Sequence, residues 1–362
     1  MLSNDNLMFY GISGNHEFDR HTLKVINELS GHEFPFSHSG GGRFNDGEPA
    51  FKMKDNDKIK GGTTVIFGSP TGPKGEAHYL QRVSAAKLIY GARTVIAAMP
   101  FMRYRRQERE AKRNEISRLL LYINSIKSAG ADHLVTCDPH SAEYTQKYCD
   151  KFGLKLHVCD PTEVYAEKIR TEYMPSLGGP ENIVVLSPDL GGGIRAIKLA
   201  TALGVPAIII PKERLSGDTT RNVTDFDEAK FLQKVRKKYG KEIKIKISCD
   251  LKGIKDKSVI VCEDEISTAG TAAKIGKQLL LIGAITTILV ATHPVCTAGW
   301  QNELFLHNGK NPYTIVLLSD TRKRGDEDED KYEESTGGDV ITISLAPVFA
   351  STIIDVLEKI AA

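Results

Sequence analysis

Residues 258–280 read SVIVCEDEISTAGTAAKIGKQLL and contain a complete strand–turn–helix pattern. The apolar run 259–262 is short and β-branched, which is typical of a buried parallel strand. Two acids, Glu263 and Asp264, follow this run, and a turn of small and hydroxyl-bearing residues at 267–271 leads into a helical pattern. The stretch therefore predicts a central strand of a parallel α/β sheet, with its turn at the edge where such sheets bind ligands.

The turn at 267–271 has the chemistry of a phosphate site. A tight turn that enters a helix gathers backbone N–H groups at the positive end of the helix dipole, which favours a phosphate dianion. Ala269 and Gly270 let the backbone approach closely, the threonines add donors, and the two upstream acids could accept hydrogen bonds from sugar hydroxyls. These features indicate ribose 5-phosphate, although a plain turn in which Ser and Thr only cap the helix has the same local pattern.

Strand and helix patterns alternate along the whole chain, and the succession occurs twice. This spacing predicts an α/β fold of two similar domains, each a mainly parallel sheet flanked by helices. We expect the domains at 1–155 and 156–345, with a closing helix at 347–361 that packs back on the first. Residues 216–250 and 322–338 look like additions to the second domain, a lysine-rich excursion and a mixed-charge exposed loop.

Composition narrows the class of protein. The 362 residues carry a net charge of only +2, with 26% charged and 41% hydrophobic residues, which is typical of a globular protein rather than a nucleic-acid binder. The first residues lack the pattern of a secretory signal, and no apolar run is long enough to span a bilayer. The six cysteines have no metal-binding spacing. We therefore expect a cytoplasmic protein with reduced thiols and no membrane or nucleic-acid partner.

Three loops at predicted strand ends could bind phosphates and metal. Residues 99–109 (MPFMRYRRQER) place four arginines within seven residues, and arginine forks bind the oxygens of a polyphosphate. His140 ends the motif CDPH, and Asp189 precedes the glycines of SPDLGGG. An imidazole and a carboxylate could hold Mg²⁺ together with phosphate oxygens and water, although each residue alone could equally be structural.

A fourth motif, KER, follows the predicted strand 206–210. On an extended backbone, Lys212 and Arg214 would project to the same side. They could stabilise the negative charge that develops during phosphoryl transfer, where positioning and charge neutralisation supply most of the rate enhancement. The chain contains no GxxxxGK[ST] motif, so a nucleotide would be bound in another way.

Taken together and in this order, the motifs resemble those of the ribose-phosphate pyrophosphokinase (PRPP synthetase) family. The set consists of FNDGE (44–48), MPFMRYRRQER (99–109), CDPH (137–140), SPDLGGG (187–193), KER (212–214), EDEISTAGT (263–271) and ATHPV (291–295). The resemblance extends from about residue 8 to residue 361. It implies that both domains have the type I phosphoribosyltransferase-like fold.

The resemblance also implies an activity. The family transfers the β,γ-pyrophosphoryl group of ATP to the 1-hydroxyl of ribose 5-phosphate with Mg²⁺, giving PRPP and AMP. The matched positions imply ATP binding by Phe44, Asp46, Glu48, Arg106, Gln107 and His140, ribose 5-phosphate binding by Asp189, Glu263, Asp264, Ser267, Thr268, Ala269, Gly270 and Thr271, and transition-state stabilisation by Lys212 and Arg214. His140 is further implied in catalysis and, with Asp189, in Mg²⁺ binding.

In the family, the FNDGE-like loop reaches ATP bound at a neighbouring subunit. The resemblance therefore implies a homo-oligomer, a dimer or a dimer-based hexamer, with a shared ATP site.

The chain departs from the family pattern mainly near the acceptor. The family usually has two aspartates where Glu263 and Asp264 stand, and often a third where Ser267 stands. The stretch after His140 lacks the usual glutamine and glycine–aromatic pattern, and the segment between the KER motif and Glu263 is longer than usual. These departures concern the identity of the acceptor, the identity of the donor and the regulation by ADP and phosphate, and they leave the catalytic residues in place.

Three alternatives to PRPP synthesis follow. The enzyme could act on a larger ribose 5-phosphate derivative such as ADP-ribose, or the chain could be a non-catalytic regulatory subunit associated with PRPP synthetase. The retained His140, Asp189, Lys212 and Arg214 argue against a regulator, which needs none of them. A salvage-type phosphoribosyltransferase is disfavoured because the arginine-rich and KER loops would have no function in it.

Overall fold

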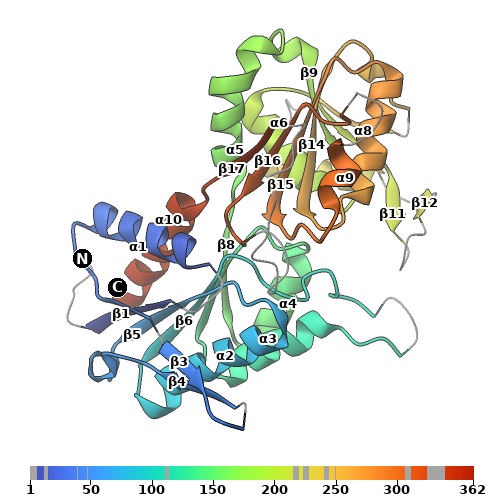
Figure 1. Ribbon diagram of the computed structural model, residues 1–362. Helices are drawn as coiled ribbons and strands as arrows, with labels where there is room; N and C mark the ends of the chain where they lie inside the picture. Colours follow the sequence, from blue (N-terminus) through green and yellow to red (C-terminus); the bar gives the residue numbers. More distant parts are fainter. Residues whose placement is uncertain are drawn as a thin grey trace. The chain divides into compact units, whose positions relative to one another are not determined.

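Two parallel sheets, each in its own part of the chain, form the framework of the protein (Figure 1). One unit comprises residues 1–160, 320–323 and 344–362, and the other comprises 161–319 and 324–343. The structure is a computed structural model and describes residues 6–11, 15–38, 40–46, 48–110, 114–214, 220–222, 228–239, 244–248, 250–305, 311–323 and 339–362. We call these units 1 and 2.

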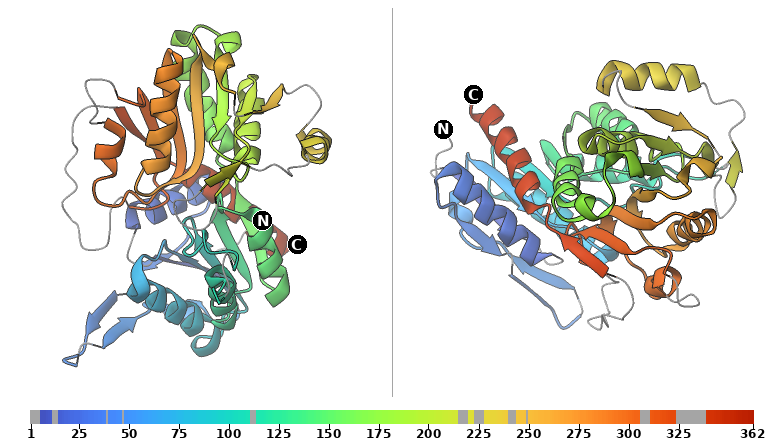
Figure 2. Two further views of the ribbon diagram at one scale, coloured as in Figure 1. Left: turned by 90° about the vertical axis from the view of Figure 1, so that its right-hand side faces the viewer. Right: turned by 90° about the horizontal axis from the view of Figure 1, so that it is seen from above.

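Unit 1 is built on a six-stranded parallel sheet of order β2-β1-β5-β6-β7-β8. Its strands are β1 (Leu7–Gly11), β2 (Phe36–His38), β5 (Thr63–Phe67), β6 (Thr94–Met99), β7 (His133–Cys137) and β8 (Lys155–Cys159). One face is covered by α1 (His16–Ser30) and α10 (Ala346–Ala361), and the other by α2 (Gly72–Ser84), α3 (Arg118–Ser128) and α4 (Ala142–Phe152) (Figure 1). An antiparallel hairpin, β3 (Gly40–Arg43) and β4 (Pro49–Lys52), extends away from this sheet (Figure 2).

Unit 2 contains a seven-stranded parallel sheet of order β13-β10-β9-β14-β15-β16-β17. Its strands are β9 (Ile183–Ser187), β10 (Ala207–Ile209), β13 (Ile245–Ile247), β14 (Ser258–Ile266), β15 (Thr286–Pro294), β16 (Ile315–Ser319) and β17 (Asp339–Ile343). The helices are α5 (Thr162–Lys168) and α6 (Gly193–Leu203) on one face, α8 (Gly270–Ile282) and α9 (Trp300–Phe305) on the other, and α7 (Glu228–Tyr239) beside α6. A separate antiparallel ribbon joins β11 (Lys212–Arg214) to β12 (Thr220–Asn222).

Short 3₁₀ and π-helical segments complete the described chain. They are η2 (Asn56–Lys58), η3 (Ala85–Ile89), η4 (Ile169–Tyr173), η5 (Met174–Ser176), η6 (Pro180–Asn182) and η7 (Lys252–Ile254).

The strands form because their apolar residues are covered on both faces by helices. β5 (TTVIF) and β9 (IVVLS) are buried along their whole length, as expected where helices pack on both sides of a parallel sheet. The expected α/β fold with two mainly parallel sheets flanked by helices is confirmed. In the described part of the chain, no helix is long and apolar enough to cross a membrane.

The strand order reverses once in each sheet. In unit 1 the reversal lies between β1 and β5, and in unit 2 it lies between β9 and β14. At such a point the connections leave toward opposite faces, so a crevice opens beyond the carboxyl ends of the two strands. In unit 2 the SPDLGGG motif follows β9 and the turn at 267–271 follows β14, so the two motifs flank this crevice.

Some boundaries differ from those expected. β14 includes Glu263 and Asp264 and continues to Ile266, because it pairs with β15 as far as Pro294, beyond the end of its pairing with β9. Helix α8 starts at Gly270, two residues earlier than the apolar pattern indicates. In the segment 216–250, β13 pairs with β10 as the edge strand of the main sheet. Of the charged loop expected at 322–338, residues 324–338 lie outside the described part.

We predict that the backbone at Ala269 is strained. Ala269 precedes α8 with φ at +65°, in the left-handed region that costs an L-residue about 1–2 kcal/mol. Ala269→Gly should leave the free energy of unfolding nearly unchanged, because relief of this strain offsets the greater flexibility of glycine in the unfolded chain and the loss of a buried methyl group, about 0.8 kcal/mol. Denaturant titration measures this free energy. Ala272→Gly inside α8 is the control and should destabilise by at least about 1 kcal/mol; a loss of stability in both variants would contradict the assigned strain.

A second prediction concerns Asp19 on α1. Its side chain is fully buried, neither oxygen has a hydrogen-bond partner among the described residues, and burial raises the pKa of the carboxyl. Ionisation of this carboxyl then opposes folding. The free energy of unfolding therefore falls as the pH rises above about 3.9, the pKa of an aspartate in an unfolded chain.

Asp19→Leu should therefore raise the free energy of unfolding by about 1–3 kcal/mol, and by more at pH 8 than at pH 5. Urea titrations at both pH values measure the difference. The exposed Glu17 on the same helix provides the control, since Glu17→Leu removes an acid that pays no burial cost. A gain that does not grow with pH would refute the raised pKa.

Candidate functional site

The turn after β9 holds the carboxylate of Asp189 in place. The Ser187 hydroxyl donates to the carbonyl of Asp189 at 2.8 Å, and the backbone N–H of Gly192 donates to Oδ1 of Asp189 at 2.9 Å. A Cβ at Gly192 would lie 2.7 Å from the Ser187 hydroxyl, so a side chain there would disrupt the turn. The half-buried Asp189 is thus fixed at the crevice beside β9, in the turn that leads to α6.

The two acids of β14 have different surroundings. Adjacent strand residues point to opposite faces of a sheet, so the carboxylates of Glu263 and Asp264 diverge. Glu263 is half-buried and lies near Tyr313, whose pKa is raised by burial and, to a smaller extent, by the charge of Glu263. Asp264 is buried. The sequence predicted that both acids follow the strand, whereas the longer β14 contains them and directs one to each face.

The turn at 267–271 leads directly into the N-terminus of α8. Thr268 and Thr271 are exposed, Ser267 and Gly270 are half-buried, and Ala269 is buried. The first N–H groups of an α-helix have no partners within the helix, so the start of α8 can bind an anion. The hydroxyls of the turn and the first N–H groups of α8, which are predicted to bind phosphate, therefore follow one another along the chain.

The turn is also braced by two residues that sequence reasoning missed. The N–H of Cys296 donates to the carbonyl of Ile266 at 2.7 Å, and the N–H of Thr297 donates to the carbonyl of Ser267 at 3.1 Å. Both donors lie just beyond the ATHPV motif, in the loop after β15. They act through the backbone, and Cys296 adopts φ of +48°, so the residue types Cys and Thr carried no signal of this role.

The KER motif forms β11 of the antiparallel ribbon. Lys212 pairs with Asn222 and Arg214 pairs with Thr220, which gives the motif an extended backbone. The structure describes only the backbone path of these residues. The expected projection of Lys212 and Arg214 to one side therefore remains a prediction.

In unit 1, the arginine-rich loop follows β6 and the CDPH motif follows the neighbouring β7. Arg106 and Gln107 are exposed, whereas Arg105 and Glu108 on either side of them are buried. This alternation anchors the loop while it presents the two side chains predicted to contact ATP.

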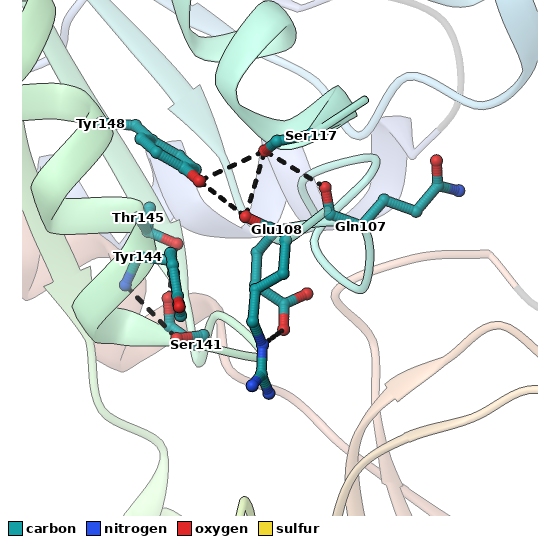
Figure 3. Close-up of polar contacts among 8 residues, drawn as sticks. Gln107, Glu108, Ser117, Ser141, Tyr144, Thr145 and Tyr148 are labelled. Atoms are coloured by element: carbon teal, nitrogen blue, oxygen red, sulfur yellow. Dashed lines mark hydrogen bonds and ion pairs between the residues drawn. The ribbon is translucent and has the colours of Figure 1, made fainter. Parts of the chain in front are cut away.

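Hydrogen bonds tie the far end of this loop to two helices (Figure 3). The Ser117 hydroxyl, at the N-cap of α3, lies 3.4 Å from the carbonyl of Gln107 and 3.1 Å from that of Glu108. The Tyr148 hydroxyl, on α4, donates to the carbonyl of Glu108 at 2.6 Å. Since α4 begins just after His140, Tyr148 links the arginine-rich loop to the helix that follows the CDPH motif.

His140 lies at the start of this second connection. It is half-buried and precedes Ser141, whose hydroxyl accepts the N–H of Tyr144 and caps α4. The preceding Asp138 adopts a positive φ of 31°, and its N–H donates to the carbonyl of Cys159 at 3.2 Å. The turn that carries His140 is thereby attached to β8.

The FNDGE motif connects β3 to β4 at the end of the hairpin. Phe44, Asp46 and Glu48 are all exposed, and 61% of the Phe44 surface is accessible. The N–H of Phe44 donates to the carbonyl of Glu48 at 2.9 Å, and the N–H of Glu48 donates to Oδ1 of Asp46 at 3.0 Å. An exposed aromatic ring at a protruding turn is available for contact with another molecule.

The FNDGE motif stands on the hairpin of β3 and β4 and the KER motif on the ribbon of β11 and β12, and the other predicted residues form two groups. Unit 1 brings the arginine-rich loop and His140 together, and unit 2 brings Asp189 together with the turn at 267–271. Among the described residues, no cluster of three or more His, Cys, Asp or Glu side chains could hold a metal by itself. Mg²⁺ commonly binds proteins through one or two side chains and is completed by water and substrate phosphates, so the absence of such a cluster from the described residues does not exclude it.

Comparisons with known proteins agree with these motifs. No family model matches the chain. The chain is 28% identical over 297 residues to ribose-phosphate pyrophosphokinase 1 of Streptococcus agalactiae, covering 81% of this chain and 80% of the relative. It is 26% identical to ribose-phosphate pyrophosphokinase 1 of Lactococcus lactis, covering 99% and 95%.

Among solved structures, phosphoribosylpyrophosphate synthetase from Mycobacterium smegmatis shares the fold, with a TM-score of 0.74 and 23% identity over 98% of this chain and 99% of that one. Over most of its length the chain is therefore similar to proteins named ribose-phosphate pyrophosphokinase, and it shares the fold of a solved phosphoribosylpyrophosphate synthetase.

Proposed function

We propose that this protein transfers the β,γ-pyrophosphoryl group of ATP to the 1-hydroxyl of ribose 5-phosphate, giving PRPP and AMP. One observation carries the proposal. The SPDLGGG turn and the turn at 267–271 flank the crevice between β9 and β14, where an open parallel sheet binds its ligand. Curated relatives named ribose-phosphate pyrophosphokinase support the same activity.

Unit 2 would bind the acceptor. The N-terminus of α8 and the hydroxyls of Ser267, Thr268 and Thr271 suit the 5-phosphate, because they offer donors where the helix dipole is positive. Glu263 and Asp264, one step upstream on β14, were both predicted to accept hydrogen bonds from the ribose hydroxyls; because they point to opposite faces of the sheet, the acid on the side of the crevice would do so directly. The bonds from Cys296 and Thr297 would keep the turn rigid while the sugar binds.

Unit 1 would bind the donor. Arg106 and Gln107 are exposed on an anchored loop and suit the polyphosphate of ATP. Phe44, Asp46 and Glu48 would contact ATP at a neighbouring subunit, which requires a homo-oligomer, a dimer or a dimer-based hexamer. Their exposure at the end of a hairpin supports this role.

His140 and Asp189 would hold Mg²⁺, and the bound ion would neutralise part of the negative charge of the phosphates. Lys212 and Arg214 would stabilise the charge that moves onto AMP as the ribose oxygen attacks the β-phosphorus. A cytoplasmic location is also part of this proposal, and the five described cysteines are buried thiols, as in proteins of reducing compartments.

The activity itself is the first test. Purified protein with Mg²⁺, ATP and ribose 5-phosphate should form AMP and PRPP in equal amounts, measured by chromatography and phosphorus NMR. Omission of Mg²⁺ should abolish the reaction. AMP formed only with ADP-ribose would replace the acceptor in our proposal, and no AMP with either acceptor would favour a regulatory subunit.

A second test concerns the KER motif. Lys212→Ala should lower kcat by about 100-fold or more and change the KM for ribose 5-phosphate little, because the lysine is assigned to the transition state. The control is Lys255→Ala, which removes an exposed lysine shortly before β14, at the opposite end of the sheet. An unchanged kcat for Lys212→Ala would remove this residue from the catalytic set.

A further inference from the structure

The arginine-rich loop turns sharply at Tyr104. Tyr104 adopts φ of +57°, in the left-handed region that a bulky residue rarely adopts. Its carbonyl accepts the N–H of Gln107 at 2.9 Å and closes a turn that includes Arg106. The exposed Arg106 and Gln107 are therefore presented by a turn whose first residue is strained, and such a turn persists only where its surroundings hold it.

The side chain of Tyr104 is held by charged neighbours. Its hydroxyl donates to Oε2 of Glu76 at 2.8 Å, and Nη1 of Arg103 donates to the same oxygen at 2.8 Å. The guanidinium carbons of Arg103 and Arg118 lie 4.8 and 4.4 Å from the centre of the Tyr104 ring, within cation–π range. The Tyr122 ring packs edge-on against it, with centroids 5.4 Å apart. Glu76 is the acid that joins these groups.

The holding groups stand on two helices. Glu76 belongs to α2, and Arg103 also donates to the carbonyl of Gly72, the first residue of that helix. Arg118 is the first residue of α3 and follows Ser117, whose hydroxyl lies against the carbonyls at the other end of the turn. Regular helices therefore hold both ends of the segment 104–108, which is a requirement for a precisely placed binding side chain.

We propose that Glu76 is a positioning residue for ATP, which holds Arg106 and Gln107 in their binding geometry through Tyr104 and Arg103. This inference rests on the proposed function only in that Arg106 and Gln107 contact ATP. Glu76 itself need not touch the substrate. Loss of Glu76 should weaken ATP binding, because the turn at Tyr104 would relax and the side chains of Arg106 and Gln107 would lose more conformational entropy on binding.

Electrostatics alone predicts the opposite sign. A negative charge in the unit that binds a polyphosphate repels it, so neutralising Glu76 without moving the loop would tighten ATP binding. The direction of the change thus separates positioning from a simple charge effect. Glutamine and alanine separate the two further, because glutamine keeps an acceptor oxygen for Tyr104 and Arg103, whereas alanine keeps none.

The experiment uses the full-length protein and measures kcat, both KM values and thermal stability, together with Mg-ATP affinity by calorimetry without acceptor. Glu76→Ala should raise the KM and Kd for ATP about tenfold, and Glu76→Gln about threefold, with kcat and the KM for ribose 5-phosphate nearly unchanged. The control is Glu28→Ala, which removes an exposed glutamate paired with Lys24 on α1, and it should change neither constant. Equal or tighter ATP binding in both Glu76 variants would overturn the proposal.

Tyr104→Phe gives an independent readout if Glu76→Ala folds poorly. It removes the hydroxyl but keeps the ring beside both arginines, so it should raise the Kd for ATP about threefold. If Glu76 and Tyr104 act together, Tyr104→Phe should raise the Kd for ATP little further in the Glu76→Ala variant. Additive effects of the two substitutions on this Kd would contradict the coupling between the residues. Wild-type protein that binds ATP but makes no PRPP would refute the proposed function and leave this test intact. Wild-type protein that binds no ATP would overturn both.

Discussion

The reversal of strand order between β9 and β14 is the constraint on which the rest of unit 2 depends. Parallel strands require crossover connections, and connections that leave two adjacent strands toward opposite faces cannot close over the edge between them. The turn that carries Asp189 and the turn at 267–271 both end at this edge. The sheet therefore places a carboxylate and a helix N-terminus beside one crevice before any side chain contributes specificity.

In unit 1 the main requirement is different: long, flexible side chains must be held in place on a surface loop. Arginine and glutamine lose considerable rotamer freedom when they bind a ligand, so a fixed backbone lowers the total cost. The buried Arg105 and Glu108 flank the exposed pair, and Ser117 and Tyr148 hold the carbonyls of Gln107 and Glu108. At the other end, Glu76, Arg103 and Arg118 surround Tyr104. The loop is therefore irregular in path but anchored at both ends to helices.

Much of the fold was predictable because it depends on local patterns. Strands such as β5 and β9 are continuous apolar runs, and every polar motif except FNDGE follows a run of this kind. The departures have tertiary causes. β14 extends through Glu263 and Asp264 because β15 continues beside it. β13 lies in a lysine-rich segment and becomes an edge strand because β10 offers a free edge with parallel register. Neither partner can be recognised from the residues of the strand itself.

The sequence by itself determined the α/β class, the order of the motifs and the kinds of ligand they suit, because apolar periodicity and side-chain chemistry are properties of the residues. Only the tertiary structure decided which motifs share a crevice, that the two acids of β14 face opposite ways, and that Cys296, Thr297 and Glu76 support the binding loops. These supports act through backbone hydrogen bonds or through charges distant in the chain, as with Glu76 and Tyr104. Their meaning comes from proximity in the folded protein, which residue type does not encode.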